Sequence, residues 1–420
     1  DPMLAPLPAA PRLVETWEEA LALVRERSTD LESAQANIDR AEGRWRQSLS
    51  ALLPNGRFSA NVSYDLRNPD RAFLPGAGGV LPGGTVPLGT GTASLTQSVV
   101  DLSAWRGLAS AEAAQRSAEA SLQDVRRRLT QGLARTLVAV VAAERAAELN
   151  RVGLRQALER AALVQRTLEL GAATQLDVAR TRQDVEVARQ SLISGDEQLR
   201  RAREALGLAL GFDRAVGVSQ RFQLQGLVAE TQNSCMPVQS VNERPDLVAA
   251  REQVDSARES RRQASAGYLP TLGLASNMFA YSSDPGLARV VTWSISAVLS
   301  VPIWEGGLRE GLVRERAGAE RQAEQTLERT RREAELEVAR TRRGVEVAES
   351  LVKTAAEGRA LAEQTDQLTR RSFEIGRGSS LELVQSAAAL RQAELALALR
   401  EFELVQARLE GFLTEARCDW

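Results

Sequence analysis

The chain has 420 residues, and its 53 Lys and Arg residues nearly balance its 55 Asp and Glu residues. This balance argues against nucleic acid as the main partner, because such a partner would require a basic surface. The chain contains no histidine, so it lacks the commonest general base and metal ligand, and we expect neither enzyme activity nor a cofactor.

The start of the chain does not resemble a targeting segment. Residues 1–6 lack the basic start and apolar core of a signal peptide. We therefore expect either a cytosolic protein or one whose signal has been removed. No run of about 18 apolar residues occurs in the sequence, so we expect no membrane-spanning helix.

Two pairs of residues occur twice along the chain. An Asp-Leu pair at 30–31 precedes a Leu-Pro pair at 53–54, and the same pairs recur at the same interval at 246–247 and 269–270. Such self-similarity indicates duplicated supersecondary units. The sequence is therefore a tandem duplication.

Each repeat is expected to contain a helix, a strand pair, a very long helix, a turn and a return helix. The turns begin at Gly171 and Gly376, which are followed by similar sequences. The first repeat is predicted at 1–212, with strands 57–67 and 90–100 and a helical hairpin at 104–211. An inter-repeat segment follows at 213–243. The second repeat is predicted at 244–412, with strands 271–281 and 290–301 and a hairpin at 306–412, and a tail follows at 413–420.

The predicted strands alternate between apolar and polar residues. The apolar series is Phe58, Ala60, Val62, Tyr64 and Leu66 in the first strand, Gly91, Ala93, Leu95 and Val99 in the second, Leu272, Leu274 and Met278 in the third, and Val291, Trp293, Ile295, Ala297, Leu299 and Val301 in the fourth. A period of two over this length suits a tilted strand that crosses a bilayer, and it also suits a half-buried soluble sheet. Four strands cannot close around a lumen, and open edges cannot face lipid. We therefore favour a membrane barrel closed by oligomerisation.

The long helices carry a seven-residue period. Residues 104–170 contain no proline and would span roughly 100 Å as one helix. Large apolar residues then recur seven apart in both return helices, at Val178, Val185, Leu192, Leu199 and Leu206 and at Leu383, Leu390, Leu397 and Leu404. This pattern predicts antiparallel coiled-coil packing. A filamentous coiled coil would show the same period.

Three motifs in this order resemble the TolC-like outer membrane efflux family. They are the helix start at 244–247 (Arg-Pro-Asp-Leu), the strand entry at 268–272 and the strand exit at 301–309. The resemblance covers about Thr16 to Phe412. It implies a mostly α protomer with β, made of long antiparallel coiled-coil helices and four transmembrane strands. Three copies would form a twelve-stranded β-barrel in the outer membrane of a Gram-negative bacterium and a twelve-helix α-barrel in the periplasm.

The resemblance also implies function and partners. A homotrimer of this family is the exit duct of a tripartite efflux or type I secretion system, contacting outer membrane lipid, a periplasmic adaptor and an inner-membrane pump of the RND or ABC type. The adaptor contact would be the turns, at Gly171, Thr174, Gly376 and Ser379. The barrel lumen would be lined by Thr92, Ser94, Thr292, Ser294 and Ser296.

The family's pore constriction maps onto Glu382, Gln385 and Asp177. Because Gln385 stands at a usual acidic position, one of two carboxylate rings is lost. The positions that latch Asp177 in some relatives hold Phe373, which has no hydroxyl, and Gly378, with Arg377 one residue earlier. A looser latch is therefore expected. Alternatively, Asp177 and Glu382 are first-turn acids favoured by the helix dipole, and Thr174 and Ser379 are ordinary N-caps.

The two cysteines leave two interpretations open. Cys235 and Cys418 would both lie in an equatorial belt formed by the inter-repeat segment and the chain ends. They are either two separate thiols or a disulfide formed in an oxidising periplasm.

Two other protein classes use long helices. A periplasmic adaptor would have one hairpin flanked by lipoyl-like and barrel domains, whereas this sequence predicts two hairpins. A coiled-coil scaffold would neither need detergent nor conduct ions.

Overall fold

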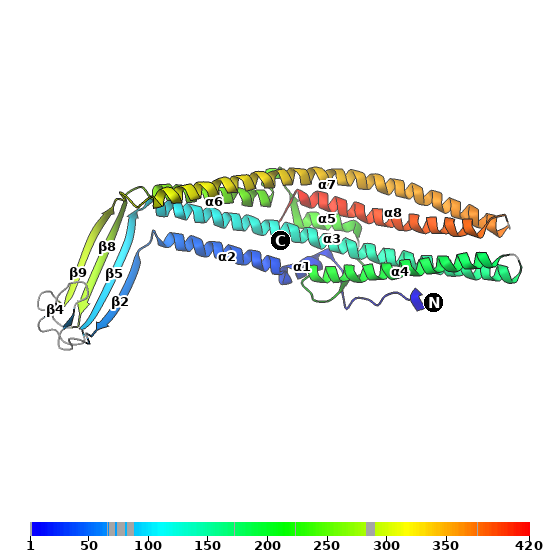
Figure 1. Ribbon diagram of the computed structural model, residues 1–420, viewed down its shortest axis with the longest axis horizontal. Coiled ribbons are helices and arrows are strands. Elements are labelled where there is room, and N and C mark those ends of the chain that lie inside the picture. The colour runs from blue at the N-terminus through cyan, green and yellow to red at the C-terminus, as the bar shows by residue number, and fades with distance from the viewer. Residues whose placement is uncertain are drawn as a thin grey trace. The chain divides into compact units, whose positions relative to one another are not determined.

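The structure is a computed structural model, and its elements are labelled in Figure 1. The described residues are 2–64, 66, 72–73, 80–81, 88–171, 173–222, 224–282, 290–375 and 377–420. They form two compact units. Unit 1 comprises Asp1–Gln35, Ser121–Leu247 and Arg331–Trp420, and unit 2 comprises Ala36–Ala120 and Val248–Thr330. Each unit draws on both halves of the sequence, so the compact units do not follow the two repeats.

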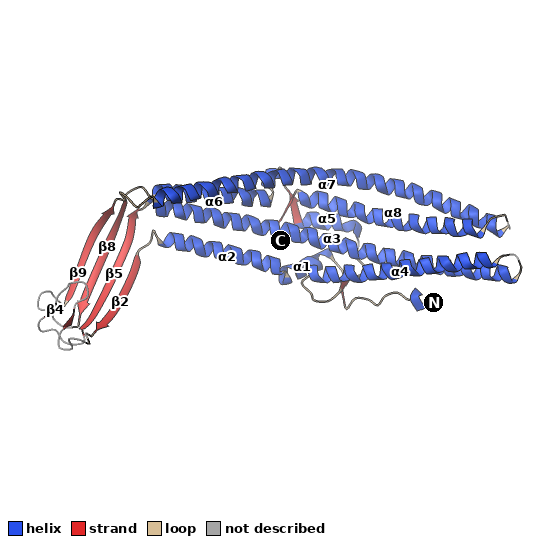
Figure 2. Cartoon of the chain, in the orientation of Figure 1, coloured by secondary structure: helices blue, strands red, loops and turns tan. Residues whose placement is uncertain are grey.

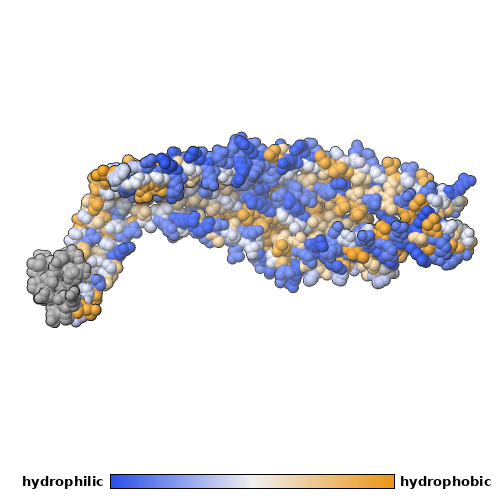
Figure 3. All heavy atoms as spheres, viewed as in Figure 1, coloured by the Kyte–Doolittle hydropathy of each residue, from blue (hydrophilic) through white to orange (hydrophobic). Residues whose placement is uncertain are grey.

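Helices dominate the described chain. They are α1 (Trp17–Arg27), α2 (Thr29–Ser50), α3 (Leu102–Glu169), α4 (Gln175–Ala209), α5 (Leu224–Ser234), α6 (Pro245–Ala266), α7 (Leu308–Glu374) and α8 (Ser380–Thr414), with 3-10 turns at Pro2–Leu4 and Val241–Glu243. Hydrophilic residues are visible along much of α7 (Figure 3). Among the described residues, no helix is both long and apolar enough to cross a membrane.

In the part of the chain that the structure describes, the strands fall into four sheets. They are drawn in red in Figure 2. Their bounds are β1 (Arg12–Val14), β2 (Asn55–Ser63), β3 (Ala72–Phe73), β4 (Val80–Leu81), β5 (Leu88–Val100), β6 (Val216–Val218), β7 (Cys235–Pro237), β8 (Thr271–Tyr281), β9 (Val291–Ser300) and β10 (Ala416–Cys418). The largest sheet lies in unit 2 and is antiparallel, in the order β2-β5-β8-β9. In the described part of the chain, β2 and β9 each pair on one side only.

The predicted face of β5 is wrong at its end, where the strand contains a β-bulge. The register with β8 shifts between Ser98 and Val100, so that Val100 lies opposite Leu272. A β-bulge inserts one extra residue, which exchanges the faces beyond it. Val100 therefore takes the apolar position that the strict alternation assigned to Val99.

Several predicted boundaries differ slightly from the structure. Strand β2 begins at Asn55 and ends at Ser63, while part of the predicted strand, at 65 and 67, lies outside the described residues. Helix α7 begins at Leu308, two residues later than predicted, because Gly306 and Gly307 have positive φ angles of 63° and 86°. Glycine adopts that conformation without steric cost, and a helix cannot include it.

The seven-residue rows behave differently in the two return helices. All five members of the α4 row, from Val178 to Leu206, are buried, as the coiled-coil pattern predicts. In α8, Leu383 is buried while the other three leucines of the row are half-buried. Within one chain, the apolar row of α8 is therefore only partly covered.

The main hydrophobic core lies in unit 1. It joins α1, α3, α4, α5 and α8, with Trp17, Leu137 and Leu413 among its fully buried members. Two small sheets border this core: β1 pairs with β6 in parallel, and β7 pairs with β10 antiparallel. The inter-repeat segment thus contacts both the start and the end of the chain.

Candidate functional site

Both helical hairpins turn through the same capping arrangement. Thr174 caps α4 and Ser379 caps α8, and each accepts a hydrogen bond from the backbone N–H three residues on, at Asp177 and Glu382. Each of these carboxylates in turn accepts a hydrogen bond from the N–H of its own cap residue, at 2.9 Å and 3.1 Å respectively. This is a capping box, which satisfies helix N–H groups that would otherwise have no partner.

Asp177 also binds the second hairpin. The Ser380 hydroxyl, at the buried start of α8, donates a short hydrogen bond to Asp177 Oδ1. This bond is the largest contribution that holds the pKa of Asp177 below its ordinary value of 3.8, followed by those from the Thr174 hydroxyl and N–H. The carboxylate is therefore ionised at neutral pH and links the two hairpin ends.

The partners that family resemblance proposed for Asp177 do not make this link. Phe373 is half-buried, and the side chain of Arg377 forms no hydrogen bond or ion pair with the described residues. At Gly378, an added Cβ would lie only 2.9 Å from the Phe373 nitrogen, because the turn folds back onto the end of α7. A side chain at that position would require the backbone of the turn to shift. The hydrogen bond to Asp177 from the second hairpin comes from Ser380.

Glu382 and Gln385 are both exposed and lie three residues apart on α8. This spacing places them on one helix face. The Glu382 carboxylate already caps its own helix, as the alternative interpretation expected. This local role leaves the second carboxylate oxygen available to solvent.

The turns themselves expose apolar side chains. Gly171 has a φ of 76° and ends the first long helix, and the neighbouring Leu170 is 76% exposed. In the second turn Ile375 is 69% exposed, whereas Gly376 lies outside the described residues. Thr174 and Ser379 are exposed between these apolar residues and the return helices.

The sheet of unit 2 collects the predicted lumen residues on one face. One row of directly opposite residues runs across the sheet from Ser59 through Thr92 and Phe279 to Thr292. A second row runs from Arg57 through Ser94 and Asn277 to Ser294, and a third row ends at Ser296. Residues directly opposite in adjacent strands share a face. Alternation alone did not reveal that Phe279 interrupts this polar face.

The other face of the sheet is apolar and uncovered. One row crosses all four strands through Phe58, Ala93, Met278 and Trp293. Phe58 is 74% and Trp293 73% exposed in the single chain. Exposed apolar surface that is continuous over several strands indicates contact with another apolar phase or protein.

The two cysteines are joined. Cys235 in β7 lies opposite Cys418 in β10, and their sulfur atoms form a disulfide. Both residues are buried at the edge of the unit 1 core.

Sequence reasoning missed a buried ion cluster between the hairpins. Asp184 of α4 accepts hydrogen bonds from Arg160 of α3 at 3.0 Å and from Arg391 of α8 at 2.6 Å. In the sequence, this ion cluster is marked only by the position of Asp184, a charged residue next to Val185 of the buried α4 row. We call Arg160, Asp184 and Arg391 the Asp184 cluster.

Comparison with known proteins identifies the family. A model of the outer membrane efflux protein family matches residues 20–212 and 236–410. The chain belongs to the outer membrane efflux protein family. The resemblance carried by the three motifs at 244–247, 268–272 and 301–309 is thereby confirmed.

Individual proteins that the chain resembles share limited sequence identity with it. The alkaline protease secretion protein AprF of Pseudomonas aeruginosa is 29% identical over 260 residues, which are 59% of this chain and 52% of AprF. The match thus spans about half of that relative's length. The outer membrane protein VceC of Vibrio cholerae has a TM-score of 0.79 at 15% identity, over 94% of this chain and 95% of VceC. The MtrE outer membrane channel of Neisseria gonorrhoeae, in its open state, has a TM-score of 0.77 at 17% identity, over 97% of this chain and 89% of MtrE. These two likenesses confirm the predicted fold of the single chain, mostly α with some strands.

Proposed function

We propose that three copies of this chain form an outer membrane exit duct of a Gram-negative bacterium. The duct receives cargo from a periplasmic adaptor and an inner-membrane pump, in a tripartite efflux or type I secretion system. It has no enzyme activity. Membership of the efflux family supports this role, as do the secretion function named for AprF and the channel named for MtrE.

The open sheet of unit 2 is the observation that carries the proposal. Its edges β2 and β9 pair on one side only in the described chain, and the row from Phe58 to Trp293 is uncovered. Pairing β9 of one copy with β2 of the next satisfies both edges and closes a barrel. The apolar row then faces lipid, while Thr92, Ser94, Thr292, Ser294 and Ser296 face water.

Planar-bilayer recording of the detergent-purified protein tests this function. The expected particle has three times the chain mass of 45.6 kDa and gives stepwise ion currents. A particle that stays in solution without detergent and gives no current would instead favour a coiled-coil scaffold.

The apolar residues at the turns, Leu170 and Ile375, suit an adaptor. A photo-crosslinker at Thr174 or Ser379 should then capture that adaptor in cells.

The exposed face of α8 predicts ion selectivity. Glu382→Gln removes the charge but keeps an amide that can cap α8, so we expect a lower preference for cations without loss of the helix start. Gln385→Glu adds a second acidic position on the same face and should shift selectivity the opposite way. The reversal potential in a KCl gradient measures both effects. Reversal potentials that stay at the wild-type value in both variants would remove this face from the constriction.

A further inference from the structure

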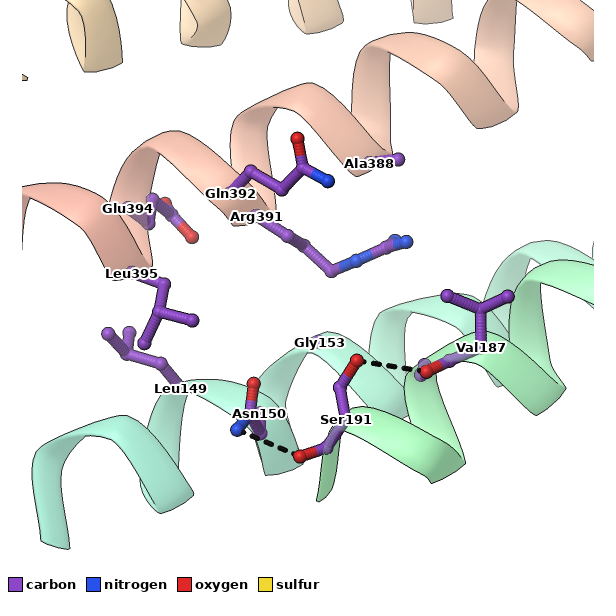
Figure 4. Close-up of a pocket in the computed structure, with 11 residues that line it drawn as sticks. Leu149, Asn150, Gly153, Val187, Ser191, Ala388, Arg391, Gln392, Glu394 and Leu395 are labelled. Carbon is purple, nitrogen blue, oxygen red and sulfur yellow. Dashed lines mark hydrogen bonds between the residues drawn. The ribbon is translucent and has the colours of Figure 1, made fainter. Parts of the chain in front are cut away.

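Arg57 is the one charged residue in the described strands β2, β5, β8 and β9 of the large sheet. It is exposed, and its guanidinium forms no hydrogen bond or ion pair with the described residues. An arginine that stabilises the fold looks different: Arg391 reaches from α8 toward the α3–α4 hairpin (Figure 4) and donates to Asp184 at 2.6 Å. Arg57 therefore carries a charge that no contact within the described chain uses.

The sheet register places Arg57 on the polar face. It lies opposite Ser94 of β5, and its row continues through Asn277 to Ser294, all of them uncharged. The next residue, Phe58, belongs to the apolar row on the other face. Because successive side chains of a strand alternate between faces, Arg57 shares the face that is proposed to meet water.

The row of Arg57 lies near the middle of the sheet. Ser94 is the central residue of the 13 in β5, and Asn277 is the seventh of the 11 in β8. An arginine that faced lipid at the middle of a membrane barrel would cost about 2–4 kcal/mol. One that faces a water-filled lumen keeps its hydration, so the position of Arg57 suits the lumen at mid-membrane depth.

Closing the sheet into a barrel brings no acid to Arg57. In the described chain β2 is an edge strand, and in the proposed trimer its open side meets β9 of the next copy, which holds no charged residue. Three copies of Arg57, one from each chain, then surround one lumen at the same depth. Fixed charges of one sign in a pore with low-dielectric walls concentrate ions of the opposite sign, and rings of arginine select anions.

We propose that the three Arg57 side chains form an anion-binding ring in the lumen of the barrel. The ring takes chloride and the carboxylate or phosphate groups of anionic cargo, because the planar fork of arginine matches such oxygen pairs. The inference rests on the proposed function, since a single chain encloses no lumen. The ring is separate from the acidic position Glu382, which belongs to unit 1 whereas Arg57 belongs to unit 2.

Reversal potentials in a KCl gradient test the ring. Arg57→Gln removes the charge and should lower the permeability of chloride relative to potassium about threefold. Arg57→Lys keeps the charge and should retain the wild-type ratio. The effect of Arg57→Gln should shrink at high salt, because the Debye length falls from about 10 Å at 0.1 M to about 3 Å at 1 M. A wild-type permeability ratio in Arg57→Gln at 0.1 M salt would overturn the proposal.

Moving the charge within the sheet provides a matched pair of controls. Adding Ser94→Arg to Arg57→Gln returns a guanidinium to the same row from the opposing strand, so anion permeability should recover. Adding Gln97→Arg instead places the same charge on the other face, opposite Leu274, and should leave the permeability ratio of Arg57→Gln unchanged. Equal recovery in both double variants would overturn the placement of Arg57 in the lumen.

A labelling measurement separates this inference from the proposed function. Ser94→Cys places a thiol opposite Arg57, and the bonded Cys235 and Cys418 leave no competing thiol. In the detergent-purified trimer, a sulfonate-bearing methanethiosulfonate should modify this thiol faster than a trimethylammonium-bearing one. Adding Arg57→Gln should lower the ratio of the two rates about threefold. A wild-type trimer without current would refute the conducting duct, whereas an unchanged ratio of rates would refute the ring, whatever current is measured.

Discussion

Arg244→Ala is expected to lower the free energy of unfolding by about 3–5 kcal/mol, the largest effect of a single substitution proposed for this chain. The Arg244 side chain is only 2% exposed and precedes α6. Its guanidinium donates to both carboxylate oxygens of Asp246, at 3.1 Å and 2.7 Å, and to Glu337 of α7 at 2.9 Å. Removing the cation would leave the half-buried Asp246 carboxylate with the Leu247 N–H but without the guanidinium that binds both of its oxygens.

Urea titration of the detergent-solubilised protein measures this effect. Arg244→Lys should fall between wild type and alanine, because an ammonium group cannot bind two oxygens of one carboxylate in the fork geometry of arginine. Arg400→Ala is the matched control, since its pair with Glu403 is exposed and should contribute below about 1 kcal/mol. Equal unfolding free energies for Arg244→Ala and Arg400→Ala would contradict the prediction.

The ion pair between Arg244 and Asp246 also predicts how the free energy of unfolding depends on pH. Burial would raise the pKa of Asp246, but the hydrogen bonds and charge of Arg244, the charge of Arg127 and the Leu247 N–H outweigh it, so the pKa lies below 3.8. A depressed folded-state pKa gives stability that is present above the unfolded value and is lost as pH falls through the folded value. We expect Asp246→Asn to unfold with a weaker pH dependence than wild type below about pH 4. An equally steep loss of unfolding free energy with falling pH in both proteins would contradict this.

Local periodicity predicted most of the fold. Alternation located the four long strands of the described chain, and the seven-residue row in α4 is buried from Val178 to Leu206, because each pattern follows the side-chain period of its element. The exceptions have local causes that periodicity does not encode. The bulge before Val100 exchanges faces, and the positive φ angles of Gly306 and Gly307 delay α7.

The candidate site was less predictable, because its contacts join distant parts of the chain. Ser380 and Asp177 are 203 residues apart, and Arg391 and Asp184 are 207 apart. No pattern within one segment specifies which residues of another will face it. Family resemblance indicated a partner for Asp177 near Phe373 and Gly378, but a side chain at Gly378 would require the backbone of the tight turn to shift. The hydrogen bond to Asp177 comes instead from the Ser380 hydroxyl.

Replacing both cysteines by alanine is expected to lower the free energy of unfolding by about 2–5 kcal/mol. The disulfide joins residues 183 positions apart, and crosslinks that close long loops restrict the unfolded chain most. Without the bond, the three-residue strand β10 retains its ladder with β7 and the hydrogen bond from Trp420 Nε1 to Thr130 at 2.8 Å. We therefore expect the end of the chain to be cleaved by protease well before the helical core opens.

Thiol counting and reductant distinguish this effect from a packing defect. The denatured wild-type chain should give no free thiol without reductant and two with it. Reductant should lower the unfolding midpoint of wild type but not that of the Cys235→Ala and Cys418→Ala double variant, which has no bond to lose. Equal thiol counts with and without reductant would refute the disulfide. If reductant lowered the unfolding midpoint of both proteins equally, the shift would come from the reductant itself and not from loss of the crosslink, because only the wild type contains the crosslink.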